Sequence, residues 1–256
     1  FMGVLIIRGG GKQGSVVYWQ VAEKYAGWRV IIWDDGNNVH HSLQRFERLK
    51  ADEKLAQEDK IHCFICVGSG ATRRLLLNTV RQRFPEAEFP TFVHPSAVVH
   101  STARVGQGCF VGAFALVNVY ATVGDFCLVN TSALVEHDCV LEDFVTINPA
   151  AVLLGTVHVG TLSTIGANSC VREQSRIPPE TVVGMQAAMV NTAITAAEKG
   201  LFWGGVPAKP LSGRAKKLQQ QSGSKLVRWV FVALFFLVVL VLLRGVPEVV
   251  KKVIEM

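Results

Sequence analysis

The feature that most constrains this chain is a six-residue repeat that runs from Val93 to Val183. Every sixth residue in this segment is aliphatic, at all sixteen positions, and the residue four places later is mostly small, as at Ala97 and Cys109. Neither the helical period of 3.6 nor the strand period of 2 produces this spacing. The repeat predicts a left-handed parallel β-helix, in which three hexapeptides form one coil of a triangular prism and the aliphatic side chains stack inside it. Gly often follows the aliphatic residue, where we expect it to ease the turn.

The residues before the repeat alternate apolar runs with amphipathic stretches, which indicates a small parallel α/β sheet, a Rossmann-like domain over 1–92. The β-helix domain then covers 93–210. The predicted strands span 3–8, 29–33, 62–67 and 89–93, the predicted helices span 15–25 and 72–84, and a charged, helix-prone stretch spans 41–58.

The C-terminal part carries most of the positive charge. Residues from Lys209 onward hold nine Lys/Arg and two Asp/Glu, whereas the rest of the chain has a balance of −1. A polar basic linker (211–225) precedes an apolar helix (226–244) and a short tail (245–256). This pattern favours attachment to a membrane, with the body on its cytoplasmic face, over nucleic-acid binding. A re-entrant or interfacial helix, or a buried oligomerisation helix, is the alternative.

The six cysteines do not form a disulfide framework, which favours a reducing compartment. Cys63 and Cys66 make a CxxC pattern within an apolar strand, where residues three apart point to opposite faces. We therefore expect neither a redox site nor a zinc site there.

A glycine loop follows the first strand and precedes the first helix. Gly9, Gly11 and Gly14 form a GxGxxG pattern with Gln13 inside it, and Asp34-Asp35 ends the second strand. Alone, this pattern suggests a dinucleotide site, as in an NAD-dependent enzyme. However, only about ninety residues precede the repeat, enough for one mononucleotide-sized half. A nucleotide sugar fits better, with the loop amides on its diphosphate and Asp34 or Asp35 on its base or ribose.

The glycine loop, Asp34-Asp35, the repeat, Val135–Cys139 and Gly205–Lys209 together resemble a known family. These are the hexapeptide-repeat sugar acyltransferases, which include sialic-acid O-acetyltransferases and N-acetyltransferases of UDP-4-amino-sugars. The resemblance covers residue 3 to about 210. It implies transfer of an acetyl or similar group from acetyl-CoA, as co-substrate, to an amino or hydroxyl group of a nucleotide-linked sugar. It also implies a homotrimer whose sites are shared between chains.

His137 is the predicted general base, because a His side chain titrates near neutral pH and can take the proton of the attacking group. Its place in the hexapeptide directs it outward, and Asp138 or Glu136 could orient its second ring nitrogen. A solvated surface histidine is the plain alternative. A metal site like that of a carbonic anhydrase is disfavoured, because the chain offers no second His near His137 and zinc needs about three ligands.

The resemblance also assigns binding residues. On the acceptor side it points to Gly68, Ser69, Arg73 and Asn130, and on the acyl-donor side to Thr146, Gly155, Ala167 and Gly184. Arg73 could equally be a solvated helix residue, and the donor-side glycines could be ordinary turn residues. Thr146 stands where similar enzymes often carry a second His, and the glycine loop reads Lys-Gln-Gly-Ser in place of Gly-His-Gly-Lys. These two departures motivate an alternative function, a membrane-tethered scaffold or nucleotide-sugar-binding protein without turnover.

Overall fold

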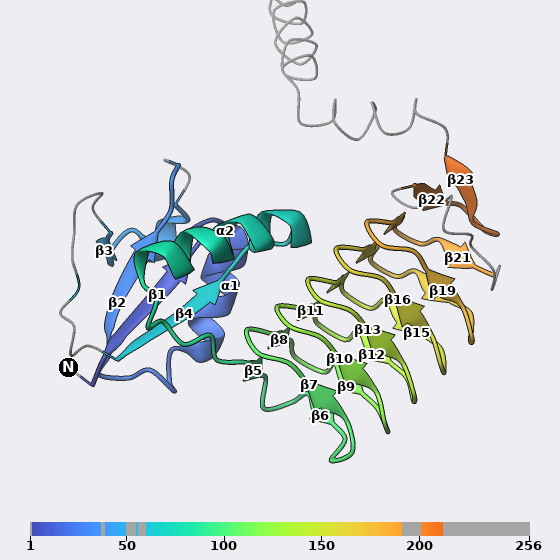
Figure 1. Ribbon diagram of the computed structural model, residues 1–256, viewed down its shortest axis with the longest axis horizontal. Coiled ribbons are helices and arrows are strands. Elements are labelled where there is room, and N and C mark those ends of the chain that lie inside the picture. The colour runs from blue at the N-terminus through green and yellow to red at the C-terminus, as the bar shows by residue number, and fades with distance from the viewer. Residues whose placement is uncertain (1, 37–38, 50–54, 56–59, 191–200, 212–256) are drawn as a thin grey trace, which may run out of the picture. The chain divides into compact units, whose positions relative to one another are not determined.

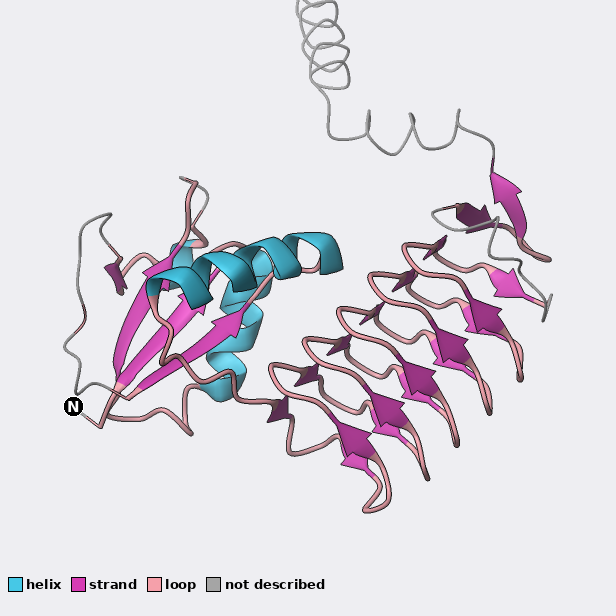
Figure 2. Ribbon diagram, viewed as in Figure 1, coloured by secondary structure: helices cyan, strands magenta, loops and turns pink. Residues whose placement is uncertain are grey.

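The computed structural model describes residues 2–36, 39–49, 55, 60–190 and 201–211 (Figure 1). Residues Phe1–Pro210 group into one compact unit, in which a small α/β region precedes a parallel β-solenoid (Figure 2). The elements of the α/β region are β1 (Val4–Arg8), α1 (Lys12–Val21), β2 (Arg29–Trp33), η1 (His41–Leu43), β3 (Glu47–Arg48), β4 (Ile61–Ile65) and α2 (Gly70–Arg83). The four strands are parallel, in the order β3-β2-β1-β4.

The apolar strands of this sheet are buried on both faces because a core cluster lies on each. Leu5 and Ile7 of β1 pack in one cluster with Val17 and Val21 of α1. The other face of β1 packs in a second cluster that contains Leu77 and Val80 of α2. Cys63 lies in the second cluster and Cys66 in the first, so they occupy opposite faces, as predicted.

Two predictions in this region are wrong. In the described part of the helix-prone stretch, 41–49, a single 3₁₀ turn is followed by Glu47 and Arg48, which pair with β2, so strand pairing overrides helix propensity there. Most of 50–58 lies outside the described residues. The segment predicted as a fourth strand, 89–93, does not join this sheet. Its last two residues form β5, the first strand of the solenoid, and only the preceding residue Glu88 bridges to His62.

The solenoid is built from two-residue strands six residues apart. Val111 pairs with Val129, and Val129 with Ile147, so strands stack at a spacing of eighteen residues. This register confirms three hexapeptides per coil and gives the parallel solenoid expected of a β-helix. The strands are β5 (Phe92–Val93), β6 (Val98–Val99), β7 (Arg104–Val105), β8 (Phe110–Val111), β9 (Leu116–Val117), β10 (Thr122–Val123), β11 (Leu128–Val129), β12 (Leu134–Val135), β13 (Val140–Leu141), β14 (Thr146–Ile147), β15 (Val152–Leu153), β16 (His158–Val159), β17 (Thr164–Ile165), β18 (Cys170–Val171), β19 (Arg176–Ile177), β20 (Val182–Val183) and β21 (Ala188–Met189), followed by β22 (Phe202–Gly204) and β23 (Lys209–Leu211).

Three faces result. The first face runs from β5 to β20 and continues into β22 and β23, the second runs from β6 to β21, and the third runs from β7 to β19. The predicted aliphatic ladder fills the interior, and its members from Val111 to Val183 are at most 2% exposed. Val93 is 39% exposed, because it starts the first coil and no coil lies beneath it.

The repeat glycines have a different role from the one expected. From Gly108 to Gln186, the residue three places after each aliphatic residue has a left-handed conformation, and at all of these corners but Gly108 it is not Gly, as at Phe114 and Asp138. The glycine directly after the aliphatic residue instead lets the next coil approach closely. A Cβ on Gly112 would lie 2.9 Å from the Thr131 nitrogen, and a Cβ on Gly166 would lie 2.5 Å from the Gly184 carbonyl carbon.

The predicted linker beyond residue 211, the apolar helix 226–244 and the tail 245–256 lie outside the described residues. Within the described part, neither helix has the length and apolar character needed to cross a bilayer.

Candidate active site

The predicted site residues of the solenoid lie on different corners of the prism, and each corner is named here after one residue. The His137 corner joins the second and third faces and comprises 118–121, 136–139 and 154–157. The Arg73 corner joins the third and first faces and comprises 124–127 and 142–145, where Arg73 binds. The Asn130 corner joins the first and second faces and comprises 112–115, 130–133, 148–151, 166–169 and 184–187.

His137 pairs with the next residue along the chain. Its Nδ1 lies 2.9 Å from Asp138 Oδ2, and both side chains are about half exposed. Asp138 has a φ of 57°, a left-handed conformation that Asp tolerates better than most residues. With Nδ1 bonded to the carboxylate, the neutral ring carries its proton on Nδ1 and leaves Nε2 as an acceptor. Nε2 has no partner within the described chain, so it can receive a proton.

Gly155 lies against the imidazole from the following coil. A Cβ at this position would lie 2.5 Å from both Cε1 and Nε2 of His137, so only Gly leaves room for the ring. The Thr156 amide donates to the His137 carbonyl at 2.9 Å and fixes the backbone there. Gly155 was predicted on the acyl-donor side, and the structure places it directly beside the candidate base.

Glu136 is held away from the imidazole. Asn118 of the preceding coil donates to Glu136 Oε2 at 2.7 Å, and the Val119 amide donates to Asn118 Oδ1 at 2.8 Å. Of the two carboxylates that could orient His137, the structure therefore selects Asp138. Sequence reasoning missed Asn118, although its position eighteen residues before Glu136 could have identified it once the coil length was fixed.

The glycine loop has a fixed backbone and one open side. Gly9 has a φ of 101°, and a Cβ on Gly14 would overlap the Gly9 carbonyl oxygen, so both positions require Gly. Gly11 is the N-cap of α1, and a Cβ there would meet no atom within 4 Å. Gln13 is half-buried, and its Nε2 lacks a partner in the described chain. Loop amides at the start of a helix can bind an anion at this open side.

The two aspartates beside the loop form contacts within the chain. Asp34 accepts from the Gly10 amide at 2.6 Å and from the Gly36 amide at 2.8 Å, and so ties the loop to the end of β2. Asp35 pairs at 2.6 Å with Arg8, a buried residue that sequence reasoning missed. The exposed part of Asp35 remains accessible to a ligand, whereas Asp34 has a role in holding the loop.

Arg73 is neither of the two alternatives predicted for it. The side chain is buried, and its guanidinium donates to the carbonyls of Val67 and Gly68 after β4. It also reaches the Arg73 corner of the solenoid, with acceptors on Phe126, Phe144, Val145 and Thr146 at 2.9–3.1 Å. Burial lowers its pKa to about 10. Arg73 therefore joins the α/β region to the solenoid and is unavailable to a nucleotide.

Thr146 belongs to the same cluster. Its side chain is buried, accepts from Arg73 and donates to the Gly68 carbonyl at 2.9 Å, so its hydroxyl is occupied within the chain. Ser69, also predicted at the acceptor site, is the N-cap of α2 and accepts from the Thr72 amide.

The remaining predicted residues line the Asn130 corner. Asn130 accepts from the Thr131 amide at 2.8 Å, and the Ala167 carbonyl accepts from the Gln186 amide. Gly184 lies under β22, where a Cβ would come within 3.1 Å of Phe202 and of the Trp203 carbonyl.

Within one chain, the glycine loop does not lie beside His137. The α/β region packs on the first face through Phe92, Phe110 and Leu128, and at the Arg73 corner through Arg73. The His137 corner joins the other two faces and lies opposite the first face.

Within the described ranges, the cysteines and other ligand-type residues show no grouping for a metal. Burial raises the pKa values of the Cys63 and Cys66 thiols well above the ordinary value. Among the described residues, no three His, Cys, Asp or Glu side chains gather closely enough to hold an ion.

Comparison with known proteins identifies the class. No family model and no curated protein matches the sequence. Among solved structures, the acetyltransferase domain of PglB from Neisseria gonorrhoeae is 30% identical, with a TM-score of 0.71, over 81% of this chain and 99% of that domain. PerB from Caulobacter crescentus, in complex with CoA and GDP-perosamine, is 28% identical, with a TM-score of 0.68, over 82% of this chain and 97% of its own. WeeI from Acinetobacter baumannii, 21% identical with a TM-score of 0.70 over 82% of this chain and all of its own, supports the fold alone.

The chain therefore belongs to the hexapeptide-repeat sugar acyltransferases, as the sequence predicts. It is an enzyme of that class, an acetyl-CoA-dependent sugar acetyltransferase.

Proposed function

We propose that this chain transfers an acetyl or similar group from acyl-CoA to an amino or hydroxyl group of a nucleotide-linked sugar, with His137 as general base. The observation that carries the proposal is the His137–Asp138 pair, whose imidazole lies against Gly155 and leaves Nε2 without a partner in the described chain. An exposed acceptor nitrogen on an oriented ring is the arrangement that general-base catalysis needs.

The proposed step is direct and forms no acyl-enzyme. His137 Nε2 takes the proton of the acceptor amine or hydroxyl as that group attacks the thioester carbonyl carbon. The imidazolium is stabilised by Asp138, and backbone amides of the neighbouring coil stabilise the oxyanion. When the carbon–sulfur bond breaks, the imidazolium returns the proton to the leaving CoA thiolate.

The α/β region, 1–92, is proposed as a Rossmann-like domain that binds the nucleotide sugar, and 93–210 as the acyltransferase domain. The open side of Gly11 at the start of α1 supports a diphosphate site there. PerB binds GDP-perosamine, which supports a nucleotide sugar as the acceptor.

Since the glycine loop and His137 lie on opposite sides of one chain, we propose a homotrimer in which each site joins two copies. Subunit complementation tests this arrangement. Gly11→Asp places a carboxylate in open space, where it repels a diphosphate but suits a helix N-cap. Co-expressed with His137→Ala, it should restore activity that each variant lacks alone. Mixed oligomers without activity would reject the shared site.

Residues 226–244 are proposed to attach the enzyme to the cytoplasmic face of a membrane. The charge of the flanking residues supports this location. Fractionation of cells that express the full chain tests it, and recovery in the supernatant without detergent would reject it.

The decisive experiment measures CoA thiol release from acetyl-CoA by the full chain with UDP-, GDP- and dTDP-linked amino sugars. We expect one acceptor to support release, and His137→Ala to lower kcat by about 10²–10⁴-fold. His94→Ala, which changes another partly exposed His of the solenoid, is the matched control and should keep full activity. Folded protein without release for any acceptor would favour the non-catalytic scaffold or binding protein.

A further inference from the structure

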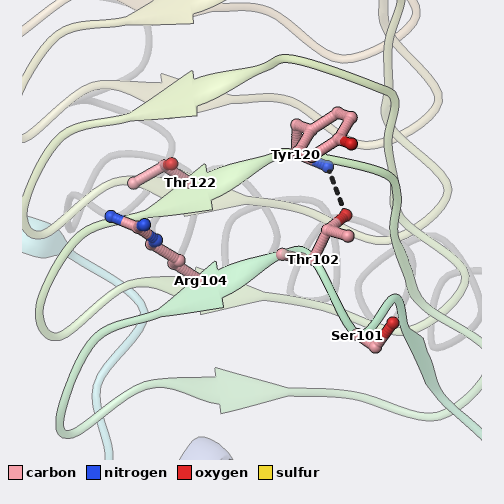
Figure 3. A pocket seen from close by; sticks show the side chains of 6 residues that line it. Ser101, Thr102, Arg104, Tyr120 and Thr122 are labelled. Atoms are coloured by element: carbon pink, nitrogen blue, oxygen red, sulfur yellow. Dashed lines mark hydrogen bonds between the residues drawn. The ribbon is translucent and has the colours of Figure 1, made fainter.

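A cavity of about 470 Å³ continues the His137 corner toward the start of the solenoid. Tyr120 occupies the position of Asp138 one coil earlier, and Thr102 occupies it two coils earlier. The cavity is lined by Ser101, Thr102, Ala103, Arg104, Tyr120 and Thr122 (Figure 3). It therefore lies on the same corner as the candidate base and on the adjoining third face.

Arg104 supplies an uncommitted positive charge to this cavity. It is exposed on β7, beside Thr122 of β10 (Figure 3), and no carboxylate pairs with it in the described part of the chain. A guanidinium matches the geometry of phosphate oxygens and can bind two of them at once. The hydroxyl of Thr122, which lies beside Arg104 (Figure 3), adds a donor that suits the same oxygens.

Tyr120 forms the opposite wall on a fixed backbone. Its amide donates to Thr102 Oγ1 at 3.0 Å (Figure 3), and that hydroxyl also contacts His100 Nδ1 at 2.9 Å. Tyr120 is 64% exposed, so its ring presents an apolar surface of the kind on which a sugar ring packs.

The distances along the prism fit one ligand. Arg104 pairs with Thr122, and Thr122 with Val140, which follows His137 by three residues. Adjacent strands lie about 4.8 Å apart, so Arg104 is about 10 Å along the prism from the level of the base. In a nucleotide sugar, the hexose ring separates the reacting group from the diphosphate on the anomeric carbon, a span of this order.

We infer that the Arg104 cavity binds the diphosphate of the nucleotide-linked acceptor, with Tyr120 against the adjoining sugar. This inference rests on the proposed function. In the proposed shared site, the glycine loop of one copy and Arg104 of another bind the same diphosphate.

The test compares steady-state kinetics of the full-length wild type with Arg104→Gln, Arg104→Lys and Tyr120→Leu, using the acceptor that supports thiol release. Arg104→Gln should raise the KM for the acceptor at least about tenfold, because it removes charge-assisted hydrogen bonds. It should leave kcat and the KM for acetyl-CoA within about twofold. Arg104→Lys should raise the acceptor KM less, since Lys keeps the positive charge but lacks the paired N–H donors of the guanidinium. Tyr120→Leu should also raise the acceptor KM.

Arg176→Gln is the matched control, because Arg176 lies on the same face two strands beyond Val140, on the side away from Arg104. An equal rise in the acceptor KM for Arg176→Gln, or no rise for Arg104→Gln, overturns the inference while the proposed function stands. If the wild type releases no thiol, titration of the wild type and Arg104→Gln with GDP and UDP tests whether Arg104 binds a diphosphate. Loss of binding in Arg104→Gln supports a diphosphate site without turnover, and unchanged or absent binding rejects it.

Discussion

The Arg73 corner and the His137 corner are built from the same six-residue repeat, yet their polar side chains differ in burial and in hydrogen bonding. At the Arg73 corner, a buried guanidinium and the Thr146 hydroxyl direct their hydrogen bonds to carbonyls of the α/β region and the solenoid. At the His137 corner, the imidazole is 56% exposed, and Nε2 is unbonded within the described chain. Polar groups whose bonds are all made inside the chain stabilise it, whereas those with an unused atom are available for chemistry. Variants of each corner should therefore affect different measurements.

The largest effect on stability is expected from Arg73→Met. The variant leaves buried carbonyls without donors, at a cost of about 1–3 kcal/mol each where water cannot replace the guanidinium. We expect the free energy of unfolding to fall by at least about 3 kcal/mol, measured by urea denaturation. Arg74→Met, which changes the adjacent exposed Arg of α2, is the control and should stay within about 0.5 kcal/mol. His137→Ala should also unfold like the wild type. Equal stability of Arg73→Met and Arg74→Met would contradict the contrast between the corners.

Gly155→Ala should separate activity from stability at the His137 corner. The added Cβ displaces an exposed ring, so the fold should tolerate it, but kcat should fall by up to about a hundredfold through misplacement of the base. The double variant with His137→Ala should lose no more activity than His137→Ala alone. Additive losses would mean that Gly155 acts through another group.

Asp138→Asn refines the role of the carboxylate. Asn also tolerates the left-handed conformation at this corner, so the backbone should be kept. Because the pair is half exposed, loss of its charge should lower kcat only by about fivefold. Glu136→Gln is the comparison, since Glu136 bonds to Asn118, and its kcat should match the wild type. A larger loss for Glu136→Gln than for Asp138→Asn would reverse the assignment.

The smallest expected effect concerns His62, a third polar site, which lies in the α/β region. It contacts the Tyr25 hydroxyl at 2.8 Å and Glu88 at 2.9 Å. Burial lowers its pKa, an effect partly offset by Glu88. The folded chain then binds this proton less readily than the unfolded chain, so stability should fall as the pH drops below about 6.5. Urea denaturation at pH 8 and pH 5.5 checks this, and His62→Gln should flatten the difference. An unchanged difference would assign it to other groups.

The repeat could be predicted from the sequence because every coil places aliphatic residues at the same six-residue spacing. Sixteen aliphatic positions fix the repeat and hence which residues share a corner, and the place of His137 in its hexapeptide directs its side chain outward. The same periodicity could have identified Asn118 as the partner of Glu136. It could not reveal the role of Arg73, because all but one of the acceptors of Arg73 are backbone carbonyls, up to 72 residues away, and a carbonyl carries no sequence signal.

The sequence by itself therefore determined the solenoid, the alternating α/β region and the class of enzyme, since these depend on periodic burial and on short motifs. Only the tertiary structure decided which carboxylate faces His137, that Gly155 makes room for the His137 ring, and that Arg73 and Thr146 join the two parts of the chain. These outcomes depend on which coils and loops meet at a corner. Such contacts form between residues far apart in the sequence, where hydrogen-bond geometry and burial determine the role of a side chain.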